Sequence, residues 1–242
     1  MAAASTESGL AKLLARRSAL EARERARPEL AGRLRELRAW QAARLARTYA
    51  DLREEPRFRA AVEFFLSDVY GPQDLTGRNR NLAQALTFLQ PLLPQAALRV
   101  LQQSIELDAL TAELDSAMAE RLPTGSLSDA AYAGAYRTVG ATEARARQLD
   151  LLVCVVADLE RISRHAWIGL VLLGARLPAQ AAGFGALQDF LERGFFAFGR
   201  MRGAEELLRI FREREQRFMQ AVLEDPIAQG KPALNGCMVR SS

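Results

Sequence analysis

Apolar side chains recur every three or four residues along almost the whole chain, which is the spacing of one face of an α-helix. No stretch alternates apolar and polar residues in the manner of a strand, and no repeat at a fixed period is visible. We therefore predict an all-α protein, a multi-helix bundle of about eight to ten helices joined by short loops.

The N-terminal part of this helical pattern is interrupted at Pro28. Proline is tolerated in the first turn of a helix, so Pro28 is expected to begin a second helix. We predict a helical arm over residues 1–27 that can move, and a single helical bundle domain over residues 28–225. Residues 226–242 lack periodicity and are predicted to be a disordered tail.

Glycine and proline residues mark helix ends within the predicted bundle. Pro123-Thr-Gly125 breaks the chain, and Ser126 followed by Asp129 resembles a capping box, with Asp in place of the usual Glu. A short apolar helix is predicted over residues 166–176. It is expected to end before Pro178, because proline cannot donate the hydrogen bond of a helix interior.

Two stretches are interpreted as densely packed. Residues 149–159 are apolar on nearly every face, which predicts a helix at the centre of the fold with Cys154 as a small core residue. Further along, Gly183, Gly185 and Gly194 are interleaved with phenylalanines. Because a glycine costs a helix roughly 1 kcal/mol, we expect these three positions to permit close packing between helices.

Charge is distributed unevenly, although the formal net charge is only +4. Residues 1–60 hold fourteen Lys or Arg against eight Asp or Glu, whereas the rest holds nineteen against twenty-one. A basic arm can bind an acidic partner, or it can be a solvated helix of mixed charge. Glutamates are interleaved with the arginines of the arm and reduce the positive potential that binds phosphate groups. This argues against nucleic-acid binding.

Most signatures of catalysis and metal binding are missing. His165 is the only histidine, which excludes zinc motifs with two histidines and the paired Glu-x-x-His of di-iron bundles. The chain has neither a Gly-x-x-x-x-Gly-Lys phosphate loop nor a Gly-x-Ser-x-Gly elbow, and its two cysteines give no disulfide framework. We therefore predict no catalytic residue, no metal site and no cofactor, and we favour a non-enzymatic protein.

His165 is nevertheless a candidate for binding a cofactor. A lone histidine can be a haem ligand, and enough helix follows it to cover a haem in a globin-like pocket. It also lies near an expected helix junction, where histidine often hydrogen bonds to exposed carbonyl groups. The sequence leaves both interpretations open.

The sequence Glu-Leu-Asp occurs twice, seven residues apart. This spacing places Glu106 and Glu113 on one helix face, and Asp108 and Asp115 on another. Paired carboxylates can bind a hard cation. However, a separation of about 10 Å along the helix axis makes it difficult for the two to share one ion. We expect a solvated face or pairing with arginines.

A polar loop after Gly71-Pro72 holds a second group of candidates. Asp74, Arg78 and Arg80 are predicted to contact an anion or a partner, because arginine pairs with phosphate and carboxylate groups. Asp and Thr side chains in such a loop also form caps and turns, which is the structural alternative.

Residues 64–74 read Phe-Phe-Leu-Ser-Asp-Val-Tyr-Gly-Pro-Gln-Asp. With residues 105–115 and 182–192, this segment resembles an uncharacterised family of bacterial all-helical proteins that carry the motif Phe-Phe-Leu-x-Asp-x-Tyr-Gly-Pro-x-Asp. The resemblance extends over roughly residues 30–225 and implies a bacterial, cytoplasmic, helical protein. The family has no established activity, so it assigns no functional residue.

The remaining choice of function lies between assembly and ligand binding. The apolar stripe of the arm needs a surface to cover it, so self-association or binding to a protein partner is our first hypothesis. A helical sensor with a pocket for haem or another small molecule is the alternative. The longest apolar stretch, residues 167–174, is far shorter than the ~20 residues of a membrane span, and no secretory signal is evident. We expect a cytoplasmic location.

Overall fold

The computed structural model describes residues 2–69, 95–123, 127–201 and 203–224. Within these ranges the chain forms ten α-helices, one π-helical turn and no strand, so the all-α prediction is confirmed. The elements are α1 (Ala2–Ala26), α2 (Pro28–Thr48), α3 (Ala50–Glu54), α4 (Arg59–Phe64), the π-helical turn η1 (Phe65–Val69), α6 (Gln95–Ala119), α7 (Asp129–Val139), α8 (Thr142–Ser163), α9 (Ala166–Ala181), α10 (Gly185–Gly199) and α11 (Glu205–Leu223).

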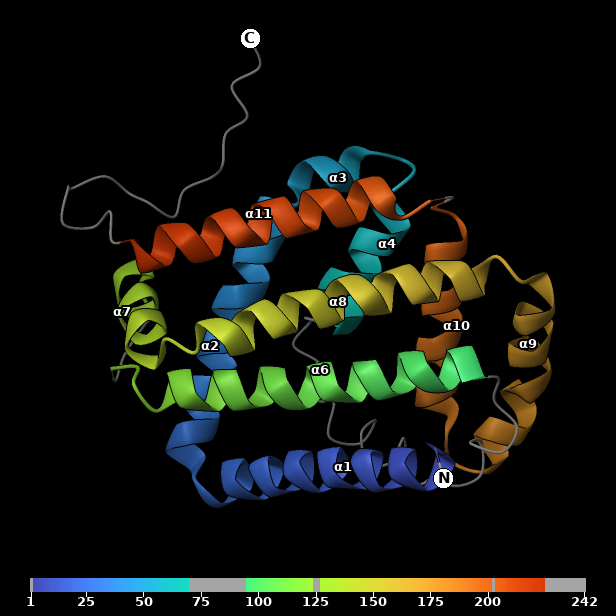
Figure 1. The fold of residues 1–242 in the computed structure, drawn as a ribbon, viewed down its shortest axis with the longest axis horizontal. Helices are drawn as coiled ribbons and strands as arrows, with labels where there is room; N and C mark the ends of the chain where they lie inside the picture. The colour runs from blue at the N-terminus through green and yellow to red at the C-terminus, as the bar shows by residue number, and fades with distance from the viewer. Residues whose placement is uncertain (1, 70–94, 124–126, 202, 225–242) are drawn as a thin grey trace, which may run out of the picture.

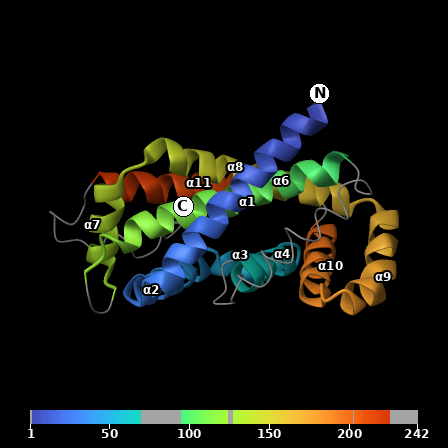
Figure 2. The same cartoon turned by 90° about the horizontal axis from the view of Figure 1, so that it is seen from below.

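The helices form two layers (Figures 1 and 2). In one layer α1, α6, α8 and α11 lie side by side in that order, and each contacts the next. In the other layer α2 packs against α6, and α10 packs against α8 and α4. α7 and α9 lie at opposite ends of the molecule. α8 contacts α6, α9, α10 and α11, which agrees with the central helix predicted from its apolar sequence.

One face of α8 is open to solvent, so the interpretation of Cys154 as a core residue is wrong. The side chain of Cys154 is exposed, as are those of Arg147 and Arg161, which lie seven residues before and after it. Residues seven apart share a helix face. The apolar run around Cys154 therefore includes a position that faces solvent. In the sequence this face is indicated only by Arg147 and Arg161, which lie outside the run.

The predicted arm corresponds to α1, which packs along α6. Leu13 and Leu14 of α1 pack against Ile105 of α6. Arg17 donates a hydrogen bond to Asp108, with 2.8 Å between Nε and Oδ2. The part of the arm's apolar stripe at Leu13 and Leu14 is thus covered by another helix of the same chain.

Of two helix starts predicted from the sequence, that of α2 is confirmed and that of α7 is wrong. α2 begins at Pro28, as predicted. α7 begins at Asp129, so its N-cap is Ser128 and the capping box predicted from Ser126 is wrong. The backbone N–H of Ala131 donates to Oγ of Ser128 at 3.2 Å, which satisfies one of the free N–H groups of the first turn.

Ser128→Ala is expected to lower the free energy of unfolding by about 1 kcal/mol, because this capping hydrogen bond is lost. Urea denaturation followed by circular dichroism measures the change. Ser128→Asp keeps an acceptor at the N-cap and should remain close to wild type. Equal losses in the two variants would show that the hydroxyl does not cap α7.

α9 extends to Ala181 and includes Pro178, so the predicted end before this proline is wrong. Proline at this position cannot donate to the carbonyl group of Gly174. Gly174 is exposed, so water can hydrogen bond to that carbonyl in place of an N–H group. The helix ends instead at Ala181, and Gly183, which follows the C-cap residue Ala182, has the positive φ of 80° that suits the left-handed conformation after a helix. No helix in the described ranges is long and apolar enough to cross a membrane.

Close packing at the predicted glycines is confirmed at one position, Gly194. A Cβ atom there would lie 3.0 Å from Cζ of Phe64. Gly183 serves the helix end described above, and Gly185 has ordinary contacts. Gly169 of α9 shows tighter packing that the sequence pattern did not reveal, because a Cβ atom there would lie 2.9 Å from Cε1 of Phe195.

The first part of the Phe-Phe-Leu-Ser-Asp segment joins α4 and η1 to α10. Phe64 and Phe65 are buried and meet Phe198 of α10 edge to face, with ring centroids 5.9 and 5.6 Å away. Asp68 accepts a hydrogen bond from Nε of Arg193 at 2.9 Å. These contacts give the described part of the segment a packing role.

Candidate functional site

The residues singled out from the sequence do not form a common site. His165 is exposed at the N-cap of α9, where its carbonyl group accepts a hydrogen bond from the N–H of Ile168 at 3.0 Å. Asp74, Arg78 and Arg80 lie outside the described residues. Among the residues that are described, no group of three or more His, Cys, Asp or Glu side chains is arranged to hold a metal ion.

All four carboxylates in the Glu-Leu-Asp repeats pair with arginines, which is one of the two outcomes that the sequence predicted. The pairs are Glu106 with Arg147, Asp108 with Arg17, Glu113 with Arg16 and Asp115 with Arg38. Asp115 behaves differently, because its residue is only 6% exposed and faces the interior of the bundle.

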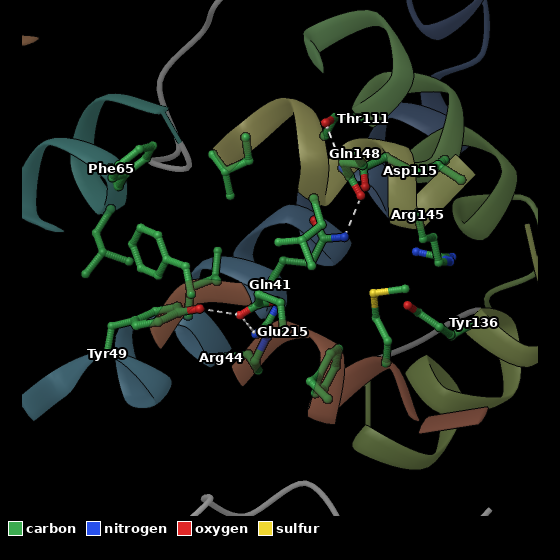
Figure 3. A pocket seen from close by; sticks show the side chains of 18 of the residues that line it. Gln41, Arg44, Tyr49, Phe65, Thr111, Asp115, Tyr136, Arg145, Gln148 and Glu215 are labelled. Carbon is green, nitrogen blue, oxygen red and sulfur yellow. Dashed lines mark hydrogen bonds and ion pairs between the residues drawn. The ribbon is translucent and has the colours of Figure 1, made fainter. Parts of the chain in front are cut away.

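Asp115 belongs to a set of polar side chains around a cavity of about 120 Å³ in the centre of the bundle (Figure 3). We call this set the central polar cluster; it comprises Gln41, Arg44, Tyr49, Thr111, Asp115, Tyr132, Tyr136, Arg145, Gln148 and Glu215. Its members come from α2, the residue that joins α2 to α3, and α6, α7, α8 and α11. The rest of the cavity wall is apolar and includes side chains from α4 and η1.

An ion pair between Arg44 and Glu215 forms one side of the cluster. Nη1 and Nη2 of Arg44 donate to the two carboxylate oxygens of Glu215 at 2.6 and 2.8 Å. The hydroxyl of Tyr49 donates to Oε1 of Glu215 at 2.7 Å. Burial by itself lowers the pKa of Arg44, but the charge and hydrogen bonds of Glu215 outweigh it, so the pKa is raised. Arg44 therefore carries its positive charge at any ordinary pH.

Asp115 lies on another side, beside Gln41. Nε2 of Gln41 donates to Oδ1 of Asp115 at 3.0 Å, and Nε of Arg38 is 3.6 Å from Oδ2. Burial raises the pKa of the Asp115 carboxyl above its usual value, and the hydrogen bond from Gln41 and the nearby arginines oppose this only in part. Asp115 thus gives up its proton less readily than an exposed aspartate.

Arg145 is the second buried guanidinium of the cluster. Its Nε donates to the carbonyl group of Gly140 at 3.1 Å, and its guanidinium carbon lies 3.5 Å from the centre of the Tyr136 ring. The carbonyl group that Arg145 contacts belongs to the turn between α7 and α8. In this turn Gly140 and Ala141 both have positive φ angles, of 62° and 51°. Burial raises the pKa of Tyr136, so its hydroxyl is neutral beside this cation.

Two buried N–H groups of the cluster have no hydrogen-bond partner: Nη2 of Arg145 and Nε of Arg44. Arg145 is only 6% exposed, and within the described ranges it forms no ion pair. Buried polar groups are nearly always hydrogen bonded, so each exception calls for an explanation.

A second unusual feature lies on the surface of α9. Five large apolar side chains there are 46–77% exposed, and we call them the α9 face: Trp167, Leu170, Val171, Leu173 and Leu177. Leu191 and Phe196 of α10 are also exposed, at 38% and 43%.

The opposite side of α9 is fixed to α10 by polar contacts. Arg176 pairs with Glu192, and Nε2 of Gln188 donates to Glu192 at 2.9 Å and to the carbonyl group of Leu172 at 2.5 Å. The hydrogen bond from Arg176 holds the pKa of Glu192 below its usual value. The α9 face is therefore held facing outward.

Residues 20–228 match the family described as "Domain of unknown function (DUF8198)". The chain belongs to this family. No curated protein and no solved structure matches the DUF8198 chain. The family description names no activity, and the central polar cluster and the α9 face are the two features of the structure that bear on function.

Sequence reasoning missed Arg44, Arg145 and Glu215, although a signal for them exists. Arg145 lies four residues before Leu149, and Glu215 lies four residues after Phe211, so both occupy the apolar stripes of their helices. A charged residue at a stripe position is a candidate for burial. The sequence does not indicate which charges on separate helices meet.

Proposed function

We propose that this DUF8198 chain is a non-enzymatic protein that acts by self-association, with the α9 face of one copy packed against the α9 face of another. The observation that supports this is the concentration of exposed hydrophobic surface. In the described part of the chain, the large apolar side chains that are exposed all lie on α9 and α10. Contiguous exposed apolar patches are typical of interaction sites, whereas single exposed apolar residues are common everywhere.

The spacing within the α9 face suits packing against another helix. Leu170 and Leu177 are seven residues apart, as are Trp167 and Gly174, which is the repeat of a helix–helix seam. A Cβ atom added at Gly174 would have nothing within 4 Å. The seam thus has a gap at its middle that can receive a side chain of the opposing helix.

The lack of charge on the α9 face favours a second copy over a partner selected by charge. Arg176 is the single charged residue of α9, and it is turned toward Glu192 of α10. A symmetric pair brings each surface group against the same surface of the other copy, so a charged face would repel itself. The apolar stripe of α1, our first candidate for this contact, is already covered by α6 at Leu13 and Leu14.

Size-exclusion chromatography with light scattering of the full chain tests this proposal. We expect the mass of a dimer for wild type and of a monomer for the double variant Leu170→Glu/Leu177→Glu, because carboxylates are costly to bury without partners. The matched control is Gln216→Glu/Gln220→Glu, which adds the same charge at two exposed positions of α11. It should remain a dimer.

A wild-type chain that stays monomeric across the micromolar range would overturn the proposal, and so would an unchanged mass in the Leu170→Glu/Leu177→Glu variant. If that variant remains dimeric and deletion of residues 1–27 abolishes the dimer, the interface lies on α1.

A further inference from the structure

We propose that the central cavity is a binding site for a small monocarboxylate with a short hydrocarbon part. Arg145, together with the free N–H of Arg44, holds the carboxylate, and the apolar wall holds the hydrocarbon. This site is built from helices other than α9 and is independent of the proposed self-association.

The burial of Arg145 and its incomplete hydrogen bonding support an anionic ligand. Its residue is 6% exposed, and Nη2 has no acceptor in the described structure. Nε of Arg145 donates to a neutral carbonyl group, that of Gly140, and the guanidinium lies against the neutral side chain of Tyr136. A guanidinium forms its strongest hydrogen bonds with carboxylate and phosphate oxygens. An anion in the cavity would supply the missing acceptor.

The direct pairing of charges in the cluster favours one negative charge beside Arg145. The charge of Arg44 is matched by the two-point contact with Glu215. Asp115 is bound by Gln41 and lies near Arg38, which is outside the cavity wall. Asp115 is near enough to Arg145 for the two charges to interact, but among the described residues no carboxylate forms an ion pair with the Arg145 guanidinium, and buried charges in proteins are normally paired.

The free Nε of Arg44 adds a second donor in the cavity wall. Both terminal nitrogens of Arg44 are used on Glu215, so Nε is the position that remains for a ligand. Figure 3 shows Arg44 beside Glu215 and Arg145 beside Tyr136, both among the side chains that line the cavity.

The size and the wall of the cavity define the rest of the ligand. The volume of about 120 Å³ is close to that of apolar protein cavities that bind benzene, about 150 Å³. Apolar side chains form much of the wall: Leu45, Val62, Phe65, Leu149, Leu152 and Phe211. Such a wall suits a hydrocarbon group, whereas inorganic phosphate would leave its further oxygens against apolar atoms. Benzoate and butyrate have the required combination of charge and apolar surface.

Isothermal titration calorimetry of the full chain with benzoate and butyrate tests the site. We expect saturable binding of one molecule per chain, and binding at least tenfold weaker for benzamide, which has the same shape without the charge. Inorganic phosphate should bind at least tenfold more weakly than benzoate. This comparison uses the wild-type chain alone, so it does not depend on whether any variant folds.

Two variants and a control locate the binding. Arg145→Gln should weaken benzoate binding at least tenfold, and Arg147→Gln, an exposed position two residues along α8 that pairs with Glu106, should leave it unchanged. Leu152→Phe fills the apolar wall without changing a charge and should also weaken binding at least tenfold.

Three results would overturn the proposal. The first is the absence of saturable binding of benzoate and butyrate to wild type, as expected if the cavity holds only water. The second is equal binding of benzoate and benzamide. The third is unchanged benzoate binding in the folded Arg145→Gln and Leu152→Phe variants. Phosphate binding as tight as that of benzoate would show an anion site but reject the apolar carboxylate.

Discussion

Glu215→Ala is expected to lower the free energy of unfolding by about 3–5 kcal/mol, because removing one partner of a buried ion pair leaves the other charge uncompensated. The Arg44 side chain is 11% exposed and that of Glu215 is 16% exposed, so little water replaces the lost contacts. The hydroxyl of Tyr49 would also lose its acceptor. Urea denaturation at neutral pH, followed by circular dichroism, measures the loss.

Glu213→Ala is the matched control on the same helix. Glu213 pairs with Arg209 and Arg217 on the exposed surface of α11. Exposed pairs contribute little, so the expected change is below about 1 kcal/mol. Comparable losses in the two alanine variants would contradict the assignment of Glu215 to the interior.

A double variant separates the contribution of the ion pair from the cost of breaking it. Arg44→Met/Glu215→Met replaces both charges with apolar side chains of similar length. Replacing a buried pair in this way is often neutral or stabilising. We expect the double variant to recover most of the stability that Glu215→Ala loses. A loss as large as that of the single variant would mean that the pair itself stabilises the bundle.

The helices could be predicted from the sequence because helix formation leaves a local signal. Periodic apolar residues predicted an all-α chain of about eight to ten helices, in agreement with the ten of the described ranges, and Pro28 marked the start of α2. The errors arose where the local signal is ambiguous. Pro178 lies in the last turn of α9, where the carbonyl group that it leaves free is exposed, so the helix tolerates it.

The central polar cluster could not be predicted because its contacts join distant parts of the chain. Arg44 and Glu215 are 171 residues apart, and Gln41 and Asp115 are 74 residues apart. Helix periodicity shows which face a residue occupies but not which helix that face meets. In the sequence, Asp115 was notable for its spacing from Asp108. The two residues differ in burial, however: Asp115 is buried, whereas Asp108 pairs with Arg17 near the surface.

The α9 face shows a different reason why the sequence could not predict the structure. Its apolar residues were visible in the sequence, and a stretch of this kind predicts a buried helix. The structure places five of its large side chains in solvent, because α9 lies at one end of the bundle and packs mainly on α10. Hydrophobicity indicates that a face needs a cover, but it does not indicate whether the same chain provides one.

Phe198→Ala is expected to lower the free energy of unfolding by about 3–5 kcal/mol, the usual range for removing a fully buried phenylalanine. Phe198 is 0% exposed and meets Phe64 and Phe65 edge to face, so its loss leaves a cavity between α10, α4 and η1. Thermal or urea denaturation of the full chain measures the change.

Phe196→Ala is the matched control, two residues away on α10 and 43% exposed. It removes the same atoms, but much of that surface is already in water, so the expected loss is about 1 kcal/mol or less. Two variants also separate stability from assembly. Phe198→Ala should destabilise the monomer, whereas Leu170→Glu/Leu177→Glu on the α9 face should weaken self-association. The reverse order of stability in the two alanine variants would mean that α10 is rotated relative to the structure described above.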